Sequence, residues 1–144
     1  MYLISACLIG ENVKYDGGNN LHSLARSLYE SGQAIPVCPE VLGGLSIPRV
    51  PSEMVGSRVI AADGTDVTAQ FHRGAEQTLA LAKKHHIKTA ILQARSPSCG
   101  SQTVYDGSFT GRLIPGQGIT TRLLEAHGIE VITIDEFARR QSEK

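Results

Sequence analysis

The chain has 144 residues, of which 41% are hydrophobic and 19% charged, the composition of a globular protein long enough to bury a core. Its 14 Lys and Arg residues balance its 14 Asp and Glu residues, so the net charge of zero predicts no basic surface for nucleic acid or for a membrane. We therefore expect residues 1–144 to form a single domain with neither of these partners.

Short apolar runs alternate with amphipathic stretches along the chain. The expected elements are, in chain order, a strand over 2–8, a helix over 21–32, a strand over 34–38, a helix over 67–86 with Asp66 as its N-cap, a strand over 89–93, a helix over 119–128 and a strand over 130–134. Strands that alternate with helices predict an α/β fold, a Rossmann-like and mainly parallel sheet with helices on both faces.

Two stretches interrupt this alternation, SRVIAADGTDVT (57–68) and TVYDGSFTGRLI (103–114). Each holds an Asp-Gly step between residues that favour strands, which predicts a hairpin or an ordered loop. We expect these insertions to lie over a functional site.

The three cysteines each follow a different predicted strand. Cys7 and Cys38 come at the ends of two strands, and Cys99 lies a few residues beyond a third. The carboxyl ends of parallel strands form one edge of a sheet, where ligands bind. The sequence therefore predicts that Cys7, Cys38 and Cys99 meet in one pocket, although 31 and 61 positions separate them.

These thiols are expected to be reduced. The N-terminus shows no signal-peptide pattern and no segment approaches the about 18 apolar residues of a membrane span, which indicates a cytoplasmic protein. An odd number of cysteines also argues against a disulfide framework.

A free cysteine at a strand end is often only a core residue, and this alternative applies to each of the three. The prolines beside Cys38 and the Pro97 and Gly100 around Cys99 instead favour ordered loops that bind a ligand. Structural zinc requires four ligands, often in paired CxxC motifs, which this chain lacks. The possible fourth ligands all fall in predicted helical stretches: His22, His72, His85, His86 and His127. A cubane iron–sulfur cluster held by three thiolates, with one iron open to water or substrate, is the other possibility.

Several motifs together resemble the thiouracil desulfidase family. They are SACLIGENVKYDGGNN (5–20), IPVCPEVLGGLSIPRVPSE (35–53), DGTDVTAQFHRGAE (63–76), ARSPSCGS (94–101) and YDGSFTGRLIPGQGIT (105–120). The resemblance runs from Ser5 to about Phe137. It implies a [4Fe-4S] cluster bound by Cys7, Cys38 and Cys99, with one iron that is not bound by protein and that accepts sulfur from a thiolated pyrimidine.

The same resemblance assigns catalytic roles to Glu40, in the CPE motif, and to Ser96, three residues before the last cysteine. A carboxylate can move protons and direct water to the ring carbon, and a hydroxyl can bind a ring carbonyl or help to position water. Without the resemblance, Glu40 reads as a solvated loop residue and Ser96 as a turn residue. Ser98 and Ser101 share this ambiguity.

The implied reaction converts a thiolated pyrimidine such as 2-thiouracil to uracil and sulfide. One alternative is a metal-free hydrolase or phosphatase with a cysteine nucleophile, but the arginine that the phosphatase loop needs six positions later is replaced by Val13, Gly44 and Tyr105. Another is a non-catalytic module that binds a metal or a nucleotide, although neither glycine-rich nucleotide motif is present. The sequence leaves the oligomeric state and the choice between base and nucleoside open.

Overall fold

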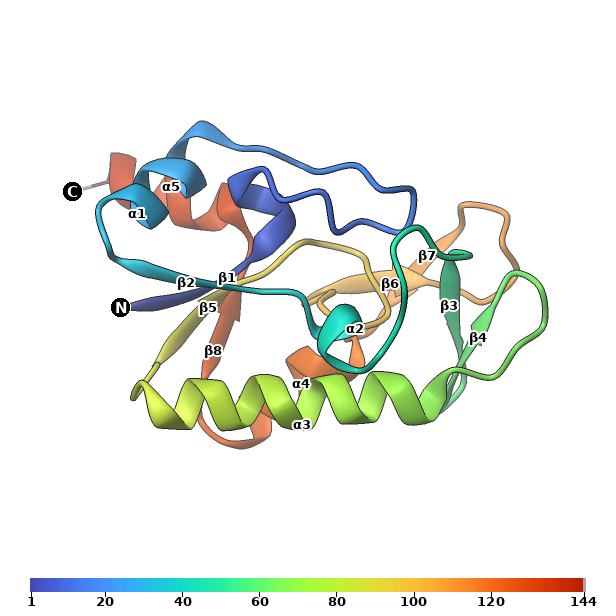
Figure 1. Ribbon diagram of the computed structural model, residues 1–144. Helices are drawn as coiled ribbons and strands as arrows, with labels where there is room; N and C mark the ends of the chain where they lie inside the picture. The colour runs from blue at the N-terminus through green and yellow to red at the C-terminus, as the bar shows by residue number, and fades with distance from the viewer. Residues whose placement is uncertain (144) are drawn as a thin grey trace.

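A computed structural model describes residues 1–143 and places a parallel sheet at the centre of the protein (Figure 1). Its strands are, in spatial order, β2 (Ala34–Val37), β1 (Tyr2–Ser5), β5 (Thr89–Ile91) and β8 (Glu130–Ile132). Ser5 pairs with Val37 and Ile4 with Ile91, so the three strands that precede the cysteines lie next to one another. The predicted α/β class with a mainly parallel sheet is confirmed.

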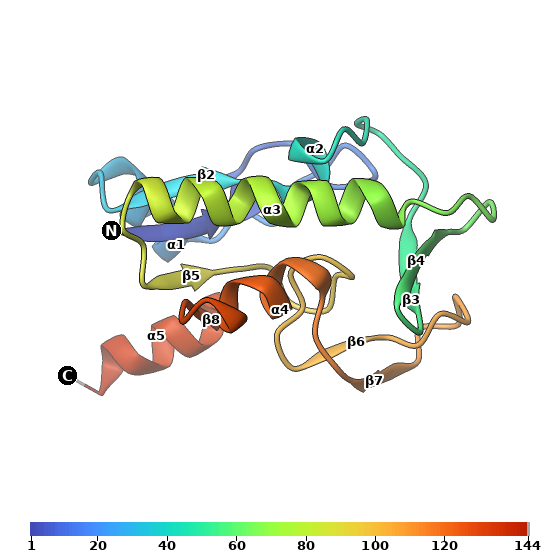
Figure 2. The same cartoon turned by 90° about the horizontal axis from the view of Figure 1, so that it is seen from below.

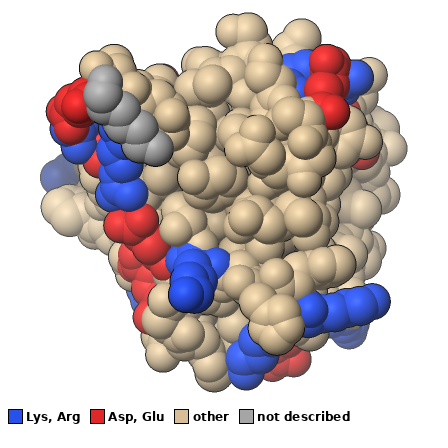
Figure 3. Space-filling model, turned by 90° about the vertical axis from the view of Figure 1, so that its left-hand side faces the viewer, with Lys and Arg blue, Asp and Glu red and all other residues tan. Residues whose placement is uncertain are grey.

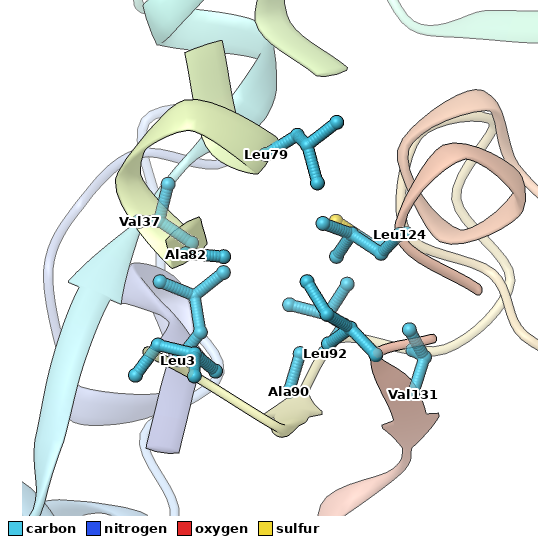
Figure 4. Close-up of a cluster of buried hydrophobic side chains, with 11 residues drawn as sticks. Leu3, Val37, Leu79, Ala82, Ala90, Leu92, Leu124 and Val131 are labelled. Carbon is cyan, nitrogen blue, oxygen red and sulfur yellow. The ribbon is translucent and has the colours of Figure 1, made fainter. Parts of the chain in front are cut away.

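Helices cover both faces of this sheet (Figure 2). They are α1 (Ser23–Glu30) and α5 (Ile134–Ser142) on one face, and α3 (Thr68–Lys84) and α4 (Ile119–Ala126) on the other. Side chains alternate between the two faces because successive strand residues point in opposite directions. Leu3 therefore packs with Leu79 of α3 and Leu124 of α4 (Figure 4), whereas its neighbour Ile4 packs with Leu28 of α1.

All four strands of the central sheet end earlier than predicted. The first strand ends at Ser5, and Ala6–Ile9 form the 3-10 helix η1, because β2 ends at Val37 and offers no further pairing partner. The strand β5 ends at Ile91 rather than at residue 93. The last strand ends at Ile132 because the Thr133 hydroxyl accepts a hydrogen bond of 3.1 Å from the Glu136 N–H and so begins α5, a helix that we did not predict.

The predicted N-cap of the long helix is also wrong. Asp66 lies one residue before the N-cap position, which Val67 occupies without a side-chain bond. The Asp66 carboxylate nevertheless accepts a hydrogen bond of 2.9 Å from the Thr68 N–H, in a local turn that precedes the helix.

Two hairpins lie beyond the carboxyl edge of the sheet (Figures 1 and 2). They pair β3 (Ser52–Val55) with β4 (Arg58–Ala61), and β6 (Thr103–Tyr105) with β7 (Leu113–Pro115). The hairpin predicted over 103–114 is confirmed. The other hairpin turns at Gly56, which has a φ of 63°, so the Asp63-Gly64 step lies after β4 and not at the turn.

The surface at the amino ends of the strands carries acidic and basic side chains mainly along its margins (Figure 3), consistent with the net charge of zero. Within residues 1–143, no helix is long and apolar enough to cross a membrane.

Candidate active site

A cavity of about 650 Å³ opens at the carboxyl edge of the sheet, and Cys7, Cys38 and Cys99 all line it. The strand β1 lies between β2 and β5, and the chain leaves β1 toward one neighbour and later returns to the other. Such a change of direction is where ligands bind in open α/β sheets. The predicted meeting of the three thiols in one pocket is confirmed.

Cys7 lies in η1, directly after β1. Gly10 closes this short helix with a φ of 96°, and the backbone N–H of Asn20 donates to the Cys7 carbonyl over 2.9 Å. The Asn20 side-chain amide also donates to the Cys7 sulfur over 3.7 Å. The long loop that follows Cys7 thus returns to fix both the backbone and the thiol.

Cys38 is the N-cap of the short helix α2 (Pro39–Leu42), which the sequence analysis did not predict. This helix lies beside α3 (Figures 1 and 2), and the two helices contact each other at Gly43 and Gly74. A Cβ atom on Gly74 would lie 1.9 Å from the Pro39 carbonyl oxygen, and one on Gly43 would lie 2.0 Å from that of Gln70. The position of Cys38 therefore depends on a contact that only glycine permits.

Cys99 lies in an irregular loop that begins after β5. The first N–H groups of α4 bind this loop, because Gly118 donates to Gly100 over 2.8 Å and Thr120 donates to Ser98 over 2.9 Å. The Thr121 hydroxyl donates to the Cys99 carbonyl over 2.8 Å. These bonds hold a loop without regular structure in one conformation.

Burial raises the pKa of all three thiols. For Cys99, burial and then the negative charge of Glu40 raise the pKa to about 12. For Cys7, the hydrogen bond from Asn20 opposes the effect of burial on the pKa, and for Cys38 the backbone N–H of Val41 does so. A thiol enzyme without a metal needs the opposite shift, toward the thiolate, so the geometry does not favour a cysteine nucleophile.

The spacing of the thiols also bears on the kind of metal site. Sulfurs that share one tetrahedral zinc lie about 4 Å apart, because each bond is about 2.3 Å long. Among residues 1–143, no three His, Cys, Asp or Glu side chains are close enough to hold one ion, and the residues that line the cavity in this range include no histidine. The three thiols line one cavity, but the described residues do not form a closed site for a single zinc ion.

Glu40 lines the same cavity with a side chain that is 20% exposed. Its carboxylate accepts a hydrogen bond of 3.4 Å from the Arg49 guanidinium, which also donates to the Val13 carbonyl over 3.0 Å and to that of Ser46 over 3.1 Å. Burial raises the pKa of Glu40, while the charge of Arg49 lowers it. Arg49 is nearly buried and so fixes the direction of Glu40, a role that the sequence analysis missed.

Ser96 lies at the start of the turn that carries Cys99 and also lines the cavity. Its hydroxyl oxygen accepts a hydrogen bond of 2.7 Å from the Cys99 N–H, and a hydroxyl in this position still has a hydrogen to donate to a ligand. Ser98 instead forms a buried hydrogen bond of 2.7 Å with Thr120 and is structural. The Asp16 and Asp106 carboxylates accept hydrogen bonds from the backbone N–H groups of Gly18 and Ser108, a pattern typical of turn residues.

Both hairpins contribute to the cavity, but of the two predicted insertions only residues 103–114 line it, since none of residues 57–68 does. Ser52 and Glu53 of β3 line it together with Tyr105 of β6 and with Phe109 in the following loop. None of these residues could be given a role from the sequence, since their contacts join segments that are far apart in the chain. The available signal was the YDGSFTG motif, whose glycines and aspartate indicate an ordered loop.

The fold and the site together define an α/β protein with three cysteines in one cavity at the switch point of its central parallel sheet. A family model described as 2-thiouracil desulfurase matches residues 2–136, and the chain belongs to this family.

Two similar proteins extend over nearly the whole chain. The uncharacterized protein YbbK of Bacillus subtilis (strain 168) is 39% identical over 147 residues, which cover 95% of this chain and 97% of that protein. A solved structure of the [4Fe-4S]-dependent thiouracil desulfidase TudS is 43% identical, with a TM-score of 0.91. That similarity covers 99% of this chain and 98% of the TudS chain.

Proposed function

We propose that this protein is a [4Fe-4S]-dependent desulfidase that converts a thiolated pyrimidine such as 2-thiouracil to uracil and sulfide. The observation that carries the proposal is the single cavity lined by Cys7, Cys38 and Cys99, in a chain of the 2-thiouracil desulfurase family. The likeness to TudS, described as a [4Fe-4S]-dependent thiouracil desulfidase, supports the same cofactor and reaction class.

Cys7, Cys38 and Cys99 are the proposed protein ligands of the cluster, which leaves one iron without a protein ligand. Burial raises the pKa values of the thiols without a metal, and it suits this role because a bound cation would convert the thiols to thiolates. When bound, the cluster supplies a thiophilic iron site for the sulfur of the substrate.

The remaining chemistry falls to the side chains of the cavity. The net reaction exchanges sulfur for oxygen, so that a thiocarbonyl and water give a carbonyl and hydrogen sulfide without net oxidation or reduction. Glu40 directs the water toward the ring carbon and accepts its proton, while Arg49 holds the carboxylate in place. Ser96 donates a hydrogen bond to the substrate, since its oxygen already accepts one from Cys99.

Residues 1–144 form one desulfidase domain in this proposal. Its partner is a small thiolated pyrimidine, and it needs neither nucleic acid nor a membrane. Its place is the cytoplasm, where a cluster with an exposed iron and its thiolates remain reduced.

Anaerobic purification tests the proposal directly. We expect near-stoichiometric iron and sulfide, and conversion of 2-thiouracil to uracil with release of one sulfide per uracil. Replacing any one of Cys7, Cys38 and Cys99 by serine is expected to remove or destabilise the cluster, because two thiolates hold a cubane poorly. The matched control is Ser31→Ala, an exposed change at the end of α1 that should leave iron content and activity unchanged.

Three outcomes would contradict the proposal. An iron-free protein that still releases sulfide would indicate a metal-free thiol enzyme, and a Cys7→Ser protein with full iron and activity would make Cys7 a core residue. A protein that binds metal but fails to convert any thiolated pyrimidine would instead be a non-catalytic binding module.

A further inference from the structure

Phe109 is an apolar side chain in an unusual place. It lies in the loop between β6 and β7, lines the cavity with the three thiols, and remains 39% exposed. Its backbone has a φ of 58°, in the left-handed region that few residues other than glycine adopt. Outliers of this kind are common where a protein clamps a ligand.

A buried carboxylate from the other hairpin holds this loop. Glu53 of β3 is only 9% exposed, and its Oε1 atom accepts hydrogen bonds of 3.0 Å from the Gly107 N–H and 3.2 Å from the Phe109 N–H. Gly107 approaches β3 so closely that a Cβ atom there would lie 2.7 Å from the Met54 carbonyl oxygen. The two hairpins are therefore joined next to Phe109.

Within the loop, further bonds limit its motion. The Asp106 carboxylate accepts hydrogen bonds from the backbone N–H and the hydroxyl of Ser108, over 2.9 and 2.5 Å. The Ser108 hydroxyl also lies 2.6 Å from that of Thr110. Phe109 is thus presented by a rigid turn, although packing alone would favour burial of its ring.

We infer that Phe109 forms the stacking surface for the pyrimidine ring of the substrate and that Glu53 is the residue that positions it. This inference rests on the proposed function and adds a substrate contact to it. A planar base stacks well on an aromatic ring, whatever the position of its sulfur. Tyr15 and Tyr105 also line the cavity, but Phe109 combines an exposed apolar ring with a strained backbone held by a buried carboxyl group.

The test compares Phe109→Ala, Phe109→Leu and Phe109→Trp in the anaerobic holoenzyme. With 2-thiouracil as substrate, we expect Phe109→Ala to raise KM about tenfold or more and to change kcat little, because the ring contributes binding and no proton transfer. Phe109→Leu keeps apolar bulk without a π face and should raise KM partly, whereas Phe109→Trp should retain a low KM. The control is Ile114→Ala in β7, which changes an exposed apolar residue outside the cavity lining and should leave KM unchanged.

Uracil gives a second readout that requires no turnover. Its affinity for the holoenzyme, measured by calorimetry, should fall about tenfold in Phe109→Ala while the iron content stays the same. Equal KM and equal uracil affinity in wild type and Phe109→Ala would overturn the inference, even with a fully active desulfidase. A wild type that binds uracil through Phe109 but does not desulfidate 2-thiouracil would instead refute the proposed function.

The proposed role of Glu53 in positioning Phe109 is tested by comparing the KM values of Glu53 and Phe109 variants. Glu53→Ala should raise KM about as much as Phe109→Ala, and Glu53→Gln, whose amide oxygen still accepts both N–H groups, should restore most of the affinity. In the Phe109→Ala background, Glu53→Ala should add little further loss, since both changes remove the same contact. Full additivity of the two losses would show that Glu53 does not act through Phe109.

Discussion

The glycine contact between α2 and α3 gives a sharp prediction, because helix propensity and packing predict opposite effects. Gly74 lies within α3, where replacing glycine by alanine usually stabilises a helix by about 1 kcal/mol. The new Cβ atom would, however, lie 1.9 Å from the Pro39 carbonyl oxygen, whereas ordinary contacts begin at 3.4 Å.

No flexible side chain can move to relieve this overlap, since the Cβ atom is fixed directly to the backbone of α3 and the Pro39 oxygen belongs to the backbone of α2. The helix α2 must move away from α3 and take Cys38 and Glu40 with it. Overpacking of this kind costs about 1–3 kcal/mol or more, so we expect Gly74→Ala to lower the free energy of unfolding by about 2 kcal/mol despite its better helix propensity.

Urea unfolding of the metal-free protein measures this loss, and anaerobic cluster reconstitution measures the displacement of Cys38. The control is Gly128→Ala, where φ is 80° and a Cβ atom would meet nothing within 4 Å. That control should lose about 1 kcal/mol through backbone strain alone and keep its iron. A Gly74→Ala protein as stable as wild type, with full iron content, would refute the steric argument.

Two further predictions concern Glu40 and the thiols. Glu40→Gln should retain the cluster but lower turnover about 100-fold, because it removes an acid–base group. The control Glu76→Gln, at an exposed position, should leave turnover unchanged. Loss of iron together with activity in Glu40→Gln would instead make Glu40 a structural residue or a ligand. In the metal-free protein, the pKa of Cys99 is raised from 9.0 to about 12, so above pH 9 the unfolded chain releases a proton that the folded chain keeps. The free energy of unfolding of the metal-free protein should therefore fall as the pH rises from about 9 toward 12. If the urea midpoint of Cys99→Ala fell with pH as much as that of the wild type, the Cys99 thiol would not be the cause.

The meeting of the cysteines could be predicted from the sequence because it depends on local patterns. Each strand is visible as an apolar run, and the rule that parallel strands end at one edge then brings Cys7, Cys38 and Cys99 together. The strand boundaries were less accurate, since an apolar run such as residues 2–8 is buried both as a strand and as the 3-10 helix that follows β1. Burial alone does not distinguish the two.

The side chains that complete the cavity could not be predicted in the same way. Arg49 meets Glu40 only after a loop that turns back toward Val13, and Glu53 meets Phe109 across more than fifty residues. No periodicity encodes such contacts. The start of α5 could have been predicted from Thr133 and Glu136, because a threonine followed three residues later by a glutamate is a known signal for the start of a helix.

The two hairpins form sheets separate from the central one, and each lies within a single connection of the α/β core. Under the proposed assignment, the core edge supplies the cysteines, whereas the hairpins supply the walls that meet the substrate ring. Insertions at the exposed turns of the hairpins can then change these walls while the three cysteines are kept, because insertions in exposed connections are well tolerated. Substrate preference and cluster chemistry are thereby free to evolve at different rates, and grafted hairpins offer a direct route to engineering desulfidases for other thiolated bases.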